Sequence, residues 1–462
     1  MLPNKIFLLG TNKMNKIHTT KTNKPITDTC IPTCPSRYKK AINNIKRVHR
    51  NKQKMGAVAT NGDLHHLTSL TTLQEFNKSG TEGNPLFTSM HKSDLSASHH
   101  LSRAKKYLPD AIVSKENFEN IQLVSRFFPG NLTTFLGFET RLGERSNQAD
   151  FAFAISGIGN DRDILTDLLE NNDLAKGFLK HSEWQQISDF AKSWSDPNSE
   201  LSDKVKCFWL EFDMPGKTPD VLVPSVFFGP AKTANNDPAQ YTWLTERAIP
   251  LLKGQKVSEE IAALINDCLR KMPKNATLFQ VGTMLSRDVN AIRLHITKIS
   301  PDQIIPYLKN IGWRHDPTKI HQLINDFKHL ADRFVISYDI TDEGIGSKIG
   351  IELSFSGNNF QNEQRWGKLL DYLVEKGMCI LEKRNALLSY TSVDENKAIN
   401  ISVMRPIISA TGYSDDLNQS KVVRYINHIK IVYEPEKQTI AKAYPAVRLF
   451  ESADESQTKM MN

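Results

Sequence analysis

Apolar and polar residues alternate along several short segments of the chain, which is the pattern of β-strands with two unlike faces. The segment SKIGIELSF (347–355) is a clear case. Because successive side chains of a strand point to opposite faces, Lys348, Glu352 and Ser354 share one face and the residues between them form an apolar one. The apolar face needs a packing partner, whereas the polar face meets either water or an enclosed polar cavity.

The same alternation predicts five strand pairs, with one or two amphipathic helices after each of the first four. Helix starts are marked by cap residues, such as Asp161 before one helix and Ser300, followed by proline, before another. The expected strand pairs are 136–142 with 149–156, 205–213 with 223–230, 277–287 with 291–299, 333–340 with 347–355, and 427–435 with 439–450.

This repetition predicts an α+β fold built from repeated α-β-β-α units. The connectors within the pairs are short, which favours antiparallel pairing, and the helices can then all cover one side of the sheet. A sheet of ten twisted strands tends to curl or close, because open edges are a liability. We therefore expect a ten-stranded antiparallel barrel, or a strongly curved sheet, with helices outside.

Polar residues recur on the strand faces opposite the apolar ones. If the helices cover the apolar faces, a closed barrel turns the polar faces inward, where a ligand can bind. A one-sided sheet that faces water shows the same alternation and is the simpler alternative. The residues expected inside the barrel include Trp209 and Glu211 with Cys207 and Asp213, Arg293 and His295 with Thr297, Lys348, Lys430 with His428, and Lys442 with Tyr444.

Composition separates the chain into a basic leader and a mixed domain. The first 110 residues hold 18 Lys and Arg against 6 Asp and Glu, and they lack a sustained apolar period. We expect residues 1–115 to be largely disordered, residues 116–452 to form the repeat domain and residues 453–462 to be a disordered tail. The basic segment 37–54 is either a solvated tail or a contact for nucleic acid or an acidic surface.

Several classes of protein are disfavoured. No apolar run is long enough for a membrane-spanning helix and no secretory signal is evident, so we expect a cytoplasmic protein. Five cysteines do not form a disulfide framework, and the pair Cys30 and Cys34 lacks the second pair of a zinc site. The motifs of P-loop, dinucleotide, zinc-peptidase and α/β-hydrolase enzymes are missing, as is DDxxD. We expect no metal and no cofactor.

Four stretches resemble the aromatic prenyltransferases of the ABBA fold, whose ten antiparallel strands enclose a chamber. They are GFETRLGE with ADFAFAIS, CFWLEFD with PSVFFGP, SYDITDEGIGSKIGIELSF, and HIKIVYEP with AKAYP. The resemblance covers about residues 130–450. The chain departs from the family where PSVFFGP lacks a basic residue, where Glu352 replaces an expected aromatic residue, and where Tyr433 is out of phase with Lys430.

The resemblance implies metal-independent transfer of an isoprenoid from an allylic diphosphate to an aromatic or peptide acceptor, as in secondary metabolism. Glu139 or Glu211 would then act as the base toward the acceptor. Fixed cations would hold the diphosphate, and aromatic rings would stabilise the carbocation. The cations are Arg293, Lys348, Lys430 and Lys442, with His295 beside them, and the rings are those of Tyr338, Tyr444 and Trp209. The alternative is a module that binds a small molecule or peptide without chemistry.

Overall fold

The computed structural model describes residues 96–133, 135–157, 160–171, 180–214, 223–231, 238–356, 363–395 and 421–450. Most of the predicted leader, with Cys30, Cys34 and the basic segment 37–54, lies outside these residues, as does the predicted tail 453–462. No helix among the described residues is long and apolar enough to cross a membrane.

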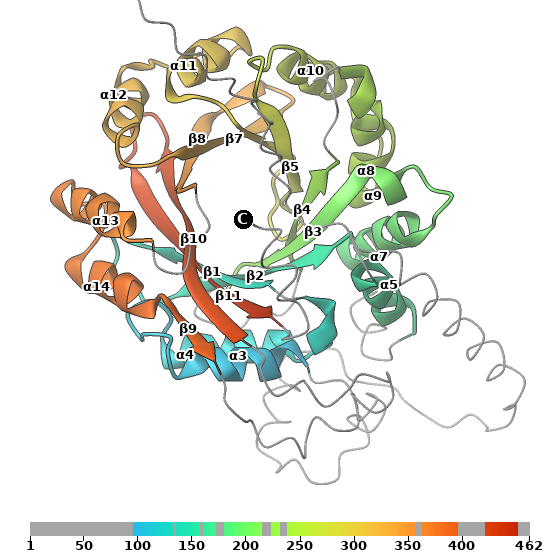
Figure 1. Cartoon of the computed structure of the whole chain (residues 1–462). Helices are drawn as coiled ribbons and strands as arrows, with labels where there is room; N and C mark the ends of the chain where they lie inside the picture. The colour runs from blue at the N-terminus through green and yellow to red at the C-terminus, as the bar shows by residue number, and fades with distance from the viewer. Residues whose placement is uncertain are drawn as a thin grey trace, which may run out of the picture.

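The described strands form a single antiparallel sheet that closes on itself (Figure 1). Strands β1 to β8 follow one another in chain order, β8 pairs with β10, and β11 pairs with both β10 and β1. Ten strands therefore make a complete barrel, as the sequence predicted. They are β1 Phe135–Arg141, β2 Ala149–Ser156, β3 Val205–Phe212, β4 Ser225–Pro230, β5 Thr277–Thr283, β6 Ile292–Thr297, β7 Arg333–Thr341, β8 Gly344–Ser354, β10 Lys421–Tyr433 and β11 Ile440–Phe450.

Strand β9 (Ser392–Glu395) is an addition that the alternation pattern did not reveal. It pairs with the first four residues of β10, before β10 reaches its partner β8. Four residues are too few for a periodic pattern to stand out. The other end of the barrel carries the β1–β2, β3–β4, β5–β6, β7–β8 and β10–β11 hairpins. We call the two ends the β9 end and the hairpin end.

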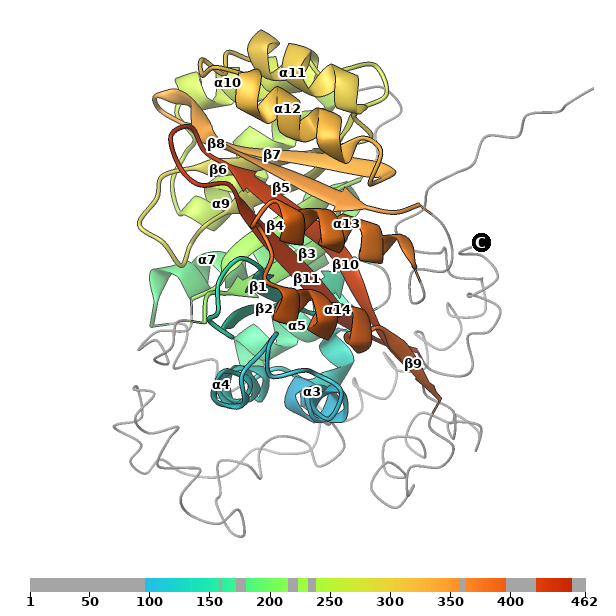
Figure 2. The ribbon, with the colours of Figure 1, turned by 90° about the vertical axis from the view of Figure 1, so that its left-hand side faces the viewer.

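Helices surround the barrel on its outer side (Figures 1 and 2). Each group of helices follows the hairpin before it, so short connections place it against the neighbouring strands. The α-helices are α3 Ala97–Lys105, α4 Lys115–Ser125, α5 Asp161–Asn171, α7 Ser182–Ser195, α8 Leu201–Lys204, α9 Ile249–Lys253, α10 Glu259–Arg270, α11 Pro301–Asn310, α12 Thr318–Phe327, α13 Arg365–Glu375 and α14 Leu381–Tyr390. Short 3-10 turns η2 (Gly130–Leu132) and η3 (Pro238–Tyr241) and a π-helical turn η4 (Leu244–Ala248) complete the outer layer.

The apolar core lies between the barrel and this helical layer. In the opening segment, Ile349, Ile351 and Leu353 are completely buried on the helix side, while Glu352 points into the barrel. Residues of β2 alternate in the same way between buried and half-buried positions. Burial of the apolar faces, at roughly 25 cal/mol per Å² of apolar surface, thus fixes which side of each strand turns inward.

Two helix starts follow the expected chemistry and one differs. The Ser258 side chain accepts the backbone N–H of Ile261 at the start of α10, and Ser300 forms a capping box with Gln303 at α11. Asp161 is the first residue of α5 rather than its cap, and its carboxylate accepts the backbone N–H of Ser156 at the end of β2.

The N-terminal helices α3 and α4 complete the ring of helices (Figure 2). Ala97, Leu101 and Ala104 of α3 are almost fully buried. The packed structure therefore includes residues 96–115, which the sequence analysis placed in the leader. The helix is hard to recognise because its buried face consists mainly of alanine, with His99 and His100 beside it.

Lys383 connects α14 to the β1–β2 hairpin through hydrogen bonds. Its side chain is fully buried and its ammonium donates to the backbone oxygens of Arg141 (2.5 Å) and Ser146 (2.6 Å). We expect Lys383→Met to lower the free energy of unfolding by about 2–3 kcal/mol, because the two carbonyl groups lose their donor. Urea unfolding measures this, with Lys368→Met on the exposed face of α13 as the control. Equal stability of the two variants would contradict it.

Candidate functional site

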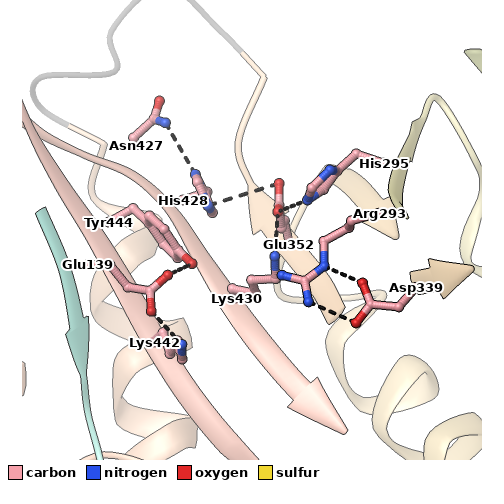
Figure 3. A network of polar contacts seen from close by, with 10 residues as sticks. All are labelled: Glu139, Arg293, His295, Asp339, Glu352, Asn427, His428, Lys430, Lys442 and Tyr444. Carbon is pink, nitrogen blue, oxygen red and sulfur yellow. Dashed lines mark hydrogen bonds and ion pairs between the residues drawn. The ribbon is translucent and has the colours of Figure 1, made fainter. Parts of the chain in front are cut away.

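The predicted polar residues gather inside the barrel (Figure 3). Glu139 comes from β1, Arg293 and His295 from β6, Lys430 from β10, and Lys442 and Tyr444 from β11. Each stands on the strand face opposite the helix-facing apolar residues. Residues far apart in sequence are therefore neighbours, because closure places β11 between β10 and β1.

The barrel interior remains accessible to solvent along β2 and β3. Inward-facing residues of these strands are half-buried, whereas their outward neighbours are buried. Two of the inward residues on β2, Ala152 and Ala154, carry only a methyl group. Since a barrel of eight strands is already wide enough for a small ligand, ten strands leave more room. The interior is thus a polar, partly open space rather than a packed core.

Arg293 and Asp339 form a bidentate pair across β6 and β7. The guanidinium Nε lies 2.7 Å from one carboxylate oxygen and a terminal nitrogen lies 2.9 Å from the other. Burial raises the pKa of Asp339, but the Arg293 guanidinium outweighs it, so that pKa lies below its usual value. Both groups are therefore charged and oriented by each other.

Glu352 is the centre of a second cluster. Its carboxylate lies 3.2 Å from the Lys430 ammonium, 3.5 Å from His295 Nε2 and 4.0 Å from His428 Nε2. Burial opposes ionisation, but the charge of the Lys430 ammonium outweighs it and lowers the pKa of Glu352 to about 2. Burial lowers the pKa of His295 to about 3, so this imidazole is neutral at pH 7.

Lys430 stands opposite Glu352 on β8, and its side chain lies over Gly350, two residues along that strand. A Cβ at Gly350 would lie 2.6 Å from Lys430 Cε and 2.3 Å from the Ser337 hydroxyl. Any larger residue would push the lysine stem away from the strand. Gly350 therefore lets the lysine lie flat along the barrel wall, with its ammonium next to the carboxylate.

Glu139 accepts hydrogen bonds from the Lys442 ammonium and the Tyr444 hydroxyl. The His428 ring stacks on the Tyr444 ring at 4.0 Å between ring centres. Burial opposes ionisation of Glu139, but Lys442, with Tyr444, lowers its pKa to about 2. Glu139 is therefore ionised at neutral pH, and each of its carboxylate oxygens already accepts a hydrogen bond. Both features make it a poor proton acceptor.

Glu211 and Asp150 are interior carboxyl groups with no cation within ion-pair distance among the described residues. Among the described residues, no hydrogen bond or ion pair to Glu211 falls within the usual distances, and Asp150 accepts the backbone N–H of Met214 (2.8 Å). Burial and then repulsion from Glu139 raise the pKa of Glu211 to about 7 and that of Asp150 to about 6. Glu211 therefore exchanges a proton near neutral pH.

A further ion pair lies toward the hairpin end. Asp213 accepts from Arg287 at 2.8 Å and from the Ser286 hydroxyl at 2.9 Å. Four cations in or beside the interior thus each have a carboxylate partner: Arg293 with Asp339, Lys430 with Glu352, Lys442 with Glu139, and the exposed Arg287 with Asp213. Glu211 and Asp150 are additional carboxyl groups beside these pairs.

Two predicted site residues lie elsewhere. Tyr338 is fully buried on the helix side of β7, where its hydroxyl lies 2.7 Å from that of Tyr307, so the prediction of an interior role is wrong. The reason is parity, since Ser337 and Asp339 on either side of it face inward. Lys348 lies at the hairpin end of β8 with 49% of its side chain exposed, 3.8 Å from Glu434, and does not join the cluster.

Asp339 and Asp150 are interior residues that the sequence analysis did not name, whereas His428 lies on the polar face where the alternation placed it. Alternation along β7 and β2 would have placed the two aspartates inward. His428 shares its face with Lys430, but its neighbour Asn427 forms a bulge in β10, so Tyr425 also faces inward. Among the residues that the structure describes, no group of three His, Cys, Asp or Glu side chains is placed to hold a metal.

No protein-family model matches the chain, and no curated protein is similar to it in sequence. Solved structures that are similar to it include a prenyltransferase, a dimethylallyltryptophan synthase and AnaPT. Prenyltransferase PriB is 12% identical, with a TM-score of 0.42 over 75% of this chain and 94% of its own. The 5-dimethylallyltryptophan synthase from Streptomyces coelicolor is 11% identical, with a TM-score of 0.42 over 76% and 97%. AnaPT from Neosartorya fischeri is 11% identical, with a TM-score of 0.45 over 80% and 96%.

At these scores the similarity does not by itself establish the fold. Strand pairing in this chain does, since β10, β11 and β1 close a ten-stranded antiparallel barrel with helices outside. That architecture is the one implied by the resemblance to ABBA-fold enzymes.

Two of the interior glutamates, Glu139 and Glu211, should affect stability in opposite ways. We expect Glu139→Gln to lower the free energy of unfolding at pH 7 by about 2–3 kcal/mol, since a depressed folded-state pKa stabilises the fold above the unfolded value of about 4.5. The deficit should shrink as the pH falls from 4.5 toward 2. Urea unfolding between pH 3 and 7 measures it, and Glu375→Gln, from an exposed ion pair, is the control. A deficit independent of pH would contradict the prediction.

Glu211→Gln should have the reverse effect. The raised folded-state pKa means that ionisation of Glu211 costs stability as the pH rises from about 4.5 through about 7. The neutral amide avoids that cost, so we expect the variant to exceed the wild type by about 1–2 kcal/mol at pH 8 and to match it near pH 4.5. Urea unfolding at the two pH values measures the difference. A variant less stable than the wild type at pH 8 would rule this out.

Proposed function

We propose that the barrel interior catalyses transfer of an isoprenoid from an allylic diphosphate to an aromatic or peptide acceptor. The observation that carries this proposal is the convergence of three cations, Arg293, Lys430 and Lys442, and one unpaired carboxyl group, Glu211, on one enclosed space. The resemblance of the sequence to the ABBA-fold enzymes supports it. One similar structure, PriB, is described as a ternary complex with L-tryptophan and dimethylallyl thiolodiphosphate.

In this proposal the diphosphate lies beside Arg293, Lys430 and Lys442. Loss of the diphosphate from the isoprenoid concentrates negative charge on the leaving group, and fixed cations stabilise that charge without reorganising. The diphosphate must compete with Asp339, Glu352 and Glu139 for these cations. A multivalent anion can do so because it accepts several charge-assisted hydrogen bonds at once.

Glu211 is the proposed general base. A base works best when its pKa is close to the working pH, and the pKa of Glu211 is about 7. Glu139, the other predicted base, has a pKa of about 2 and two donors bound to it, so we assign it the role of orienting Lys442 and Tyr444. The ring faces of Tyr444 and Trp209 would stabilise the carbocation by cation–π attraction.

A second function is favoured by a different observation. Each of the four cations already has a carboxylate partner, as expected of an interior that binds a ligand without needing to stabilise a leaving group. The barrel would then bind a small molecule or peptide reversibly. This alternative predicts that a bound ligand is recovered unchanged.

The decisive experiment uses labelled dimethylallyl or geranyl diphosphate with indoles, phenols and peptides as acceptors. We expect a prenylated product, and Glu211→Gln should lower kcat by about 10²–10⁴-fold because the base is lost. Wild-type kcat should rise with pH through a pKa near 7. The exposed Glu246→Gln of η4 is the control and should keep full activity. A folded protein that yields no product and binds no allylic diphosphate would reject the proposal, and retention of intact ligand would favour the binding function.

A further inference from the structure

The β9 end of the barrel interior has a second, separate cluster of residues. It is apolar and aromatic, unlike the charged cluster around Glu352. Phe135 of β1 packs edge-on against Trp209 of β3, with 4.9 Å between ring centres. Its other members are Val423 and Tyr425 of β10, Ala446 of β11 and, at its margin, Ala154 of β2.

Arg448 of β11 belongs to this end of the interior. It stands opposite Phe135 on β1 and Val423 on β10, and its guanidinium carbon lies 6.0 Å from the centre of the Phe135 ring. It also acts electrostatically on the Tyr425 hydroxyl, whose pKa burial raises and Arg448 lowers. Arg448 is thus placed within the aromatic cluster.

Two N–H donors in this cluster have no acceptor among the described residues. They are Nε of Arg448 and Nε1 of Trp209, and both nitrogens are shielded from solvent. Arg448 also has no carboxylate within ion-pair distance among the described residues, whereas Arg293, Lys430 and Lys442 each have one. A buried guanidinium Nε–H and a buried indole N–H without acceptors cost free energy unless a partner arrives.

We propose that the β9 end of the interior binds the anionic group of a ligand, with Arg448 and Trp209 Nε1 as donors and the rings of Phe135 and Trp209 against the ligand's apolar body. The Arg448 fork matches either a carboxylate or a phosphate in geometry. The subsite therefore accepts a carboxylate or a diphosphate attached to an aromatic or isoprenoid body. The subsite depends on the proposed function in one respect, namely which of the two substrates carries the anionic group.

An acidic group that complements the Arg448 guanidinium lies toward the hairpin end of the interior. Glu211 is on the same face of β3 as Trp209, two residues along the strand, and it has no cationic partner. A ligand anchored by its anion at Arg448 can therefore extend an N–H or O–H group toward Glu211. Uncompensated groups of opposite charge at two ends of one space orient a ligand along the barrel axis.

Equilibrium binding to the full-length protein tests the proposal by calorimetry. The probes are inorganic diphosphate, indole-3-acetate and neutral 3-methylindole. We expect Arg448→Gln to weaken at least one charged probe by about 10–100-fold, since a charge-assisted hydrogen bond is lost. Binding of 3-methylindole should be unchanged. The probe that weakens identifies the anion as a diphosphate or a carboxylate.

Three further variants keep the test falsifiable. Arg448→Lys retains the charge and should weaken binding less than Arg448→Gln does. Trp209→Phe retains the ring and should weaken it by about 2–10-fold through loss of one neutral donor. The exposed Arg314→Gln, between α11 and α12, should bind like the wild type. Thermal melting checks that each variant is folded.

Several outcomes overturn the subsite. They are wild-type protein that binds neither charged probe, Arg448→Gln that binds both as tightly as the wild type, or an equal loss for 3-methylindole. These outcomes are distinct from failure of the proposed function. Arg448-dependent binding without prenyl transfer would reject the transferase alone, and transfer that is independent of Arg448 would reject the subsite alone.

Discussion

Pairing of β11 with both β10 and β1 is the interaction on which the rest of the structure depends. Without it the sheet has two open edges and its polar face meets water on a curved surface. With it, the same residues line an interior in which solvent is restricted and electrostatic interactions are stronger. Among the described strands, the last one thus encloses the space that the first ones line, and Glu139 of β1 meets Lys442 and Tyr444 of β11 only through this closure.

Enclosure also explains the interior charge pattern. A cation that faced bulk water would need no partner, whereas Arg293, Lys430 and Lys442 lie in a confined space and each has a carboxylate. The exceptions then become informative. Glu211 has no cation within ion-pair distance among the described residues, and the Arg448 Nε–H has no acceptor among them. Such positions are where a ligand gains the most by binding.

Local backbone details refine this arrangement. The bulge at Asn427 lets Tyr425 serve the aromatic end of the interior and His428 the charged cluster from a single strand. Gly350 lets Lys430 lie along the wall. Neither feature adds a functional group, but each determines where an existing side chain points. The interior therefore has two regions of different chemistry within one continuous barrel.

The sequence alone determined the strand pairs, the helical layer and most inward-facing residues, because period-two alternation is a local property of a strand. It also placed Tyr433 on the helix side, opposite Lys430. Alternation along β7 also implies that Tyr338 points outward. The interior role was wrongly given to it because of its aromatic ring, without regard to its position on the strand.

Only the tertiary structure decided which charges pair, because Lys430 meets Glu352 from a strand 78 residues away in sequence. Ionisation states followed from that pairing. Glu139 and Glu211 are the same residue type on similar strands, yet neighbours contributed by other strands hold one charged and leave the other free to exchange a proton.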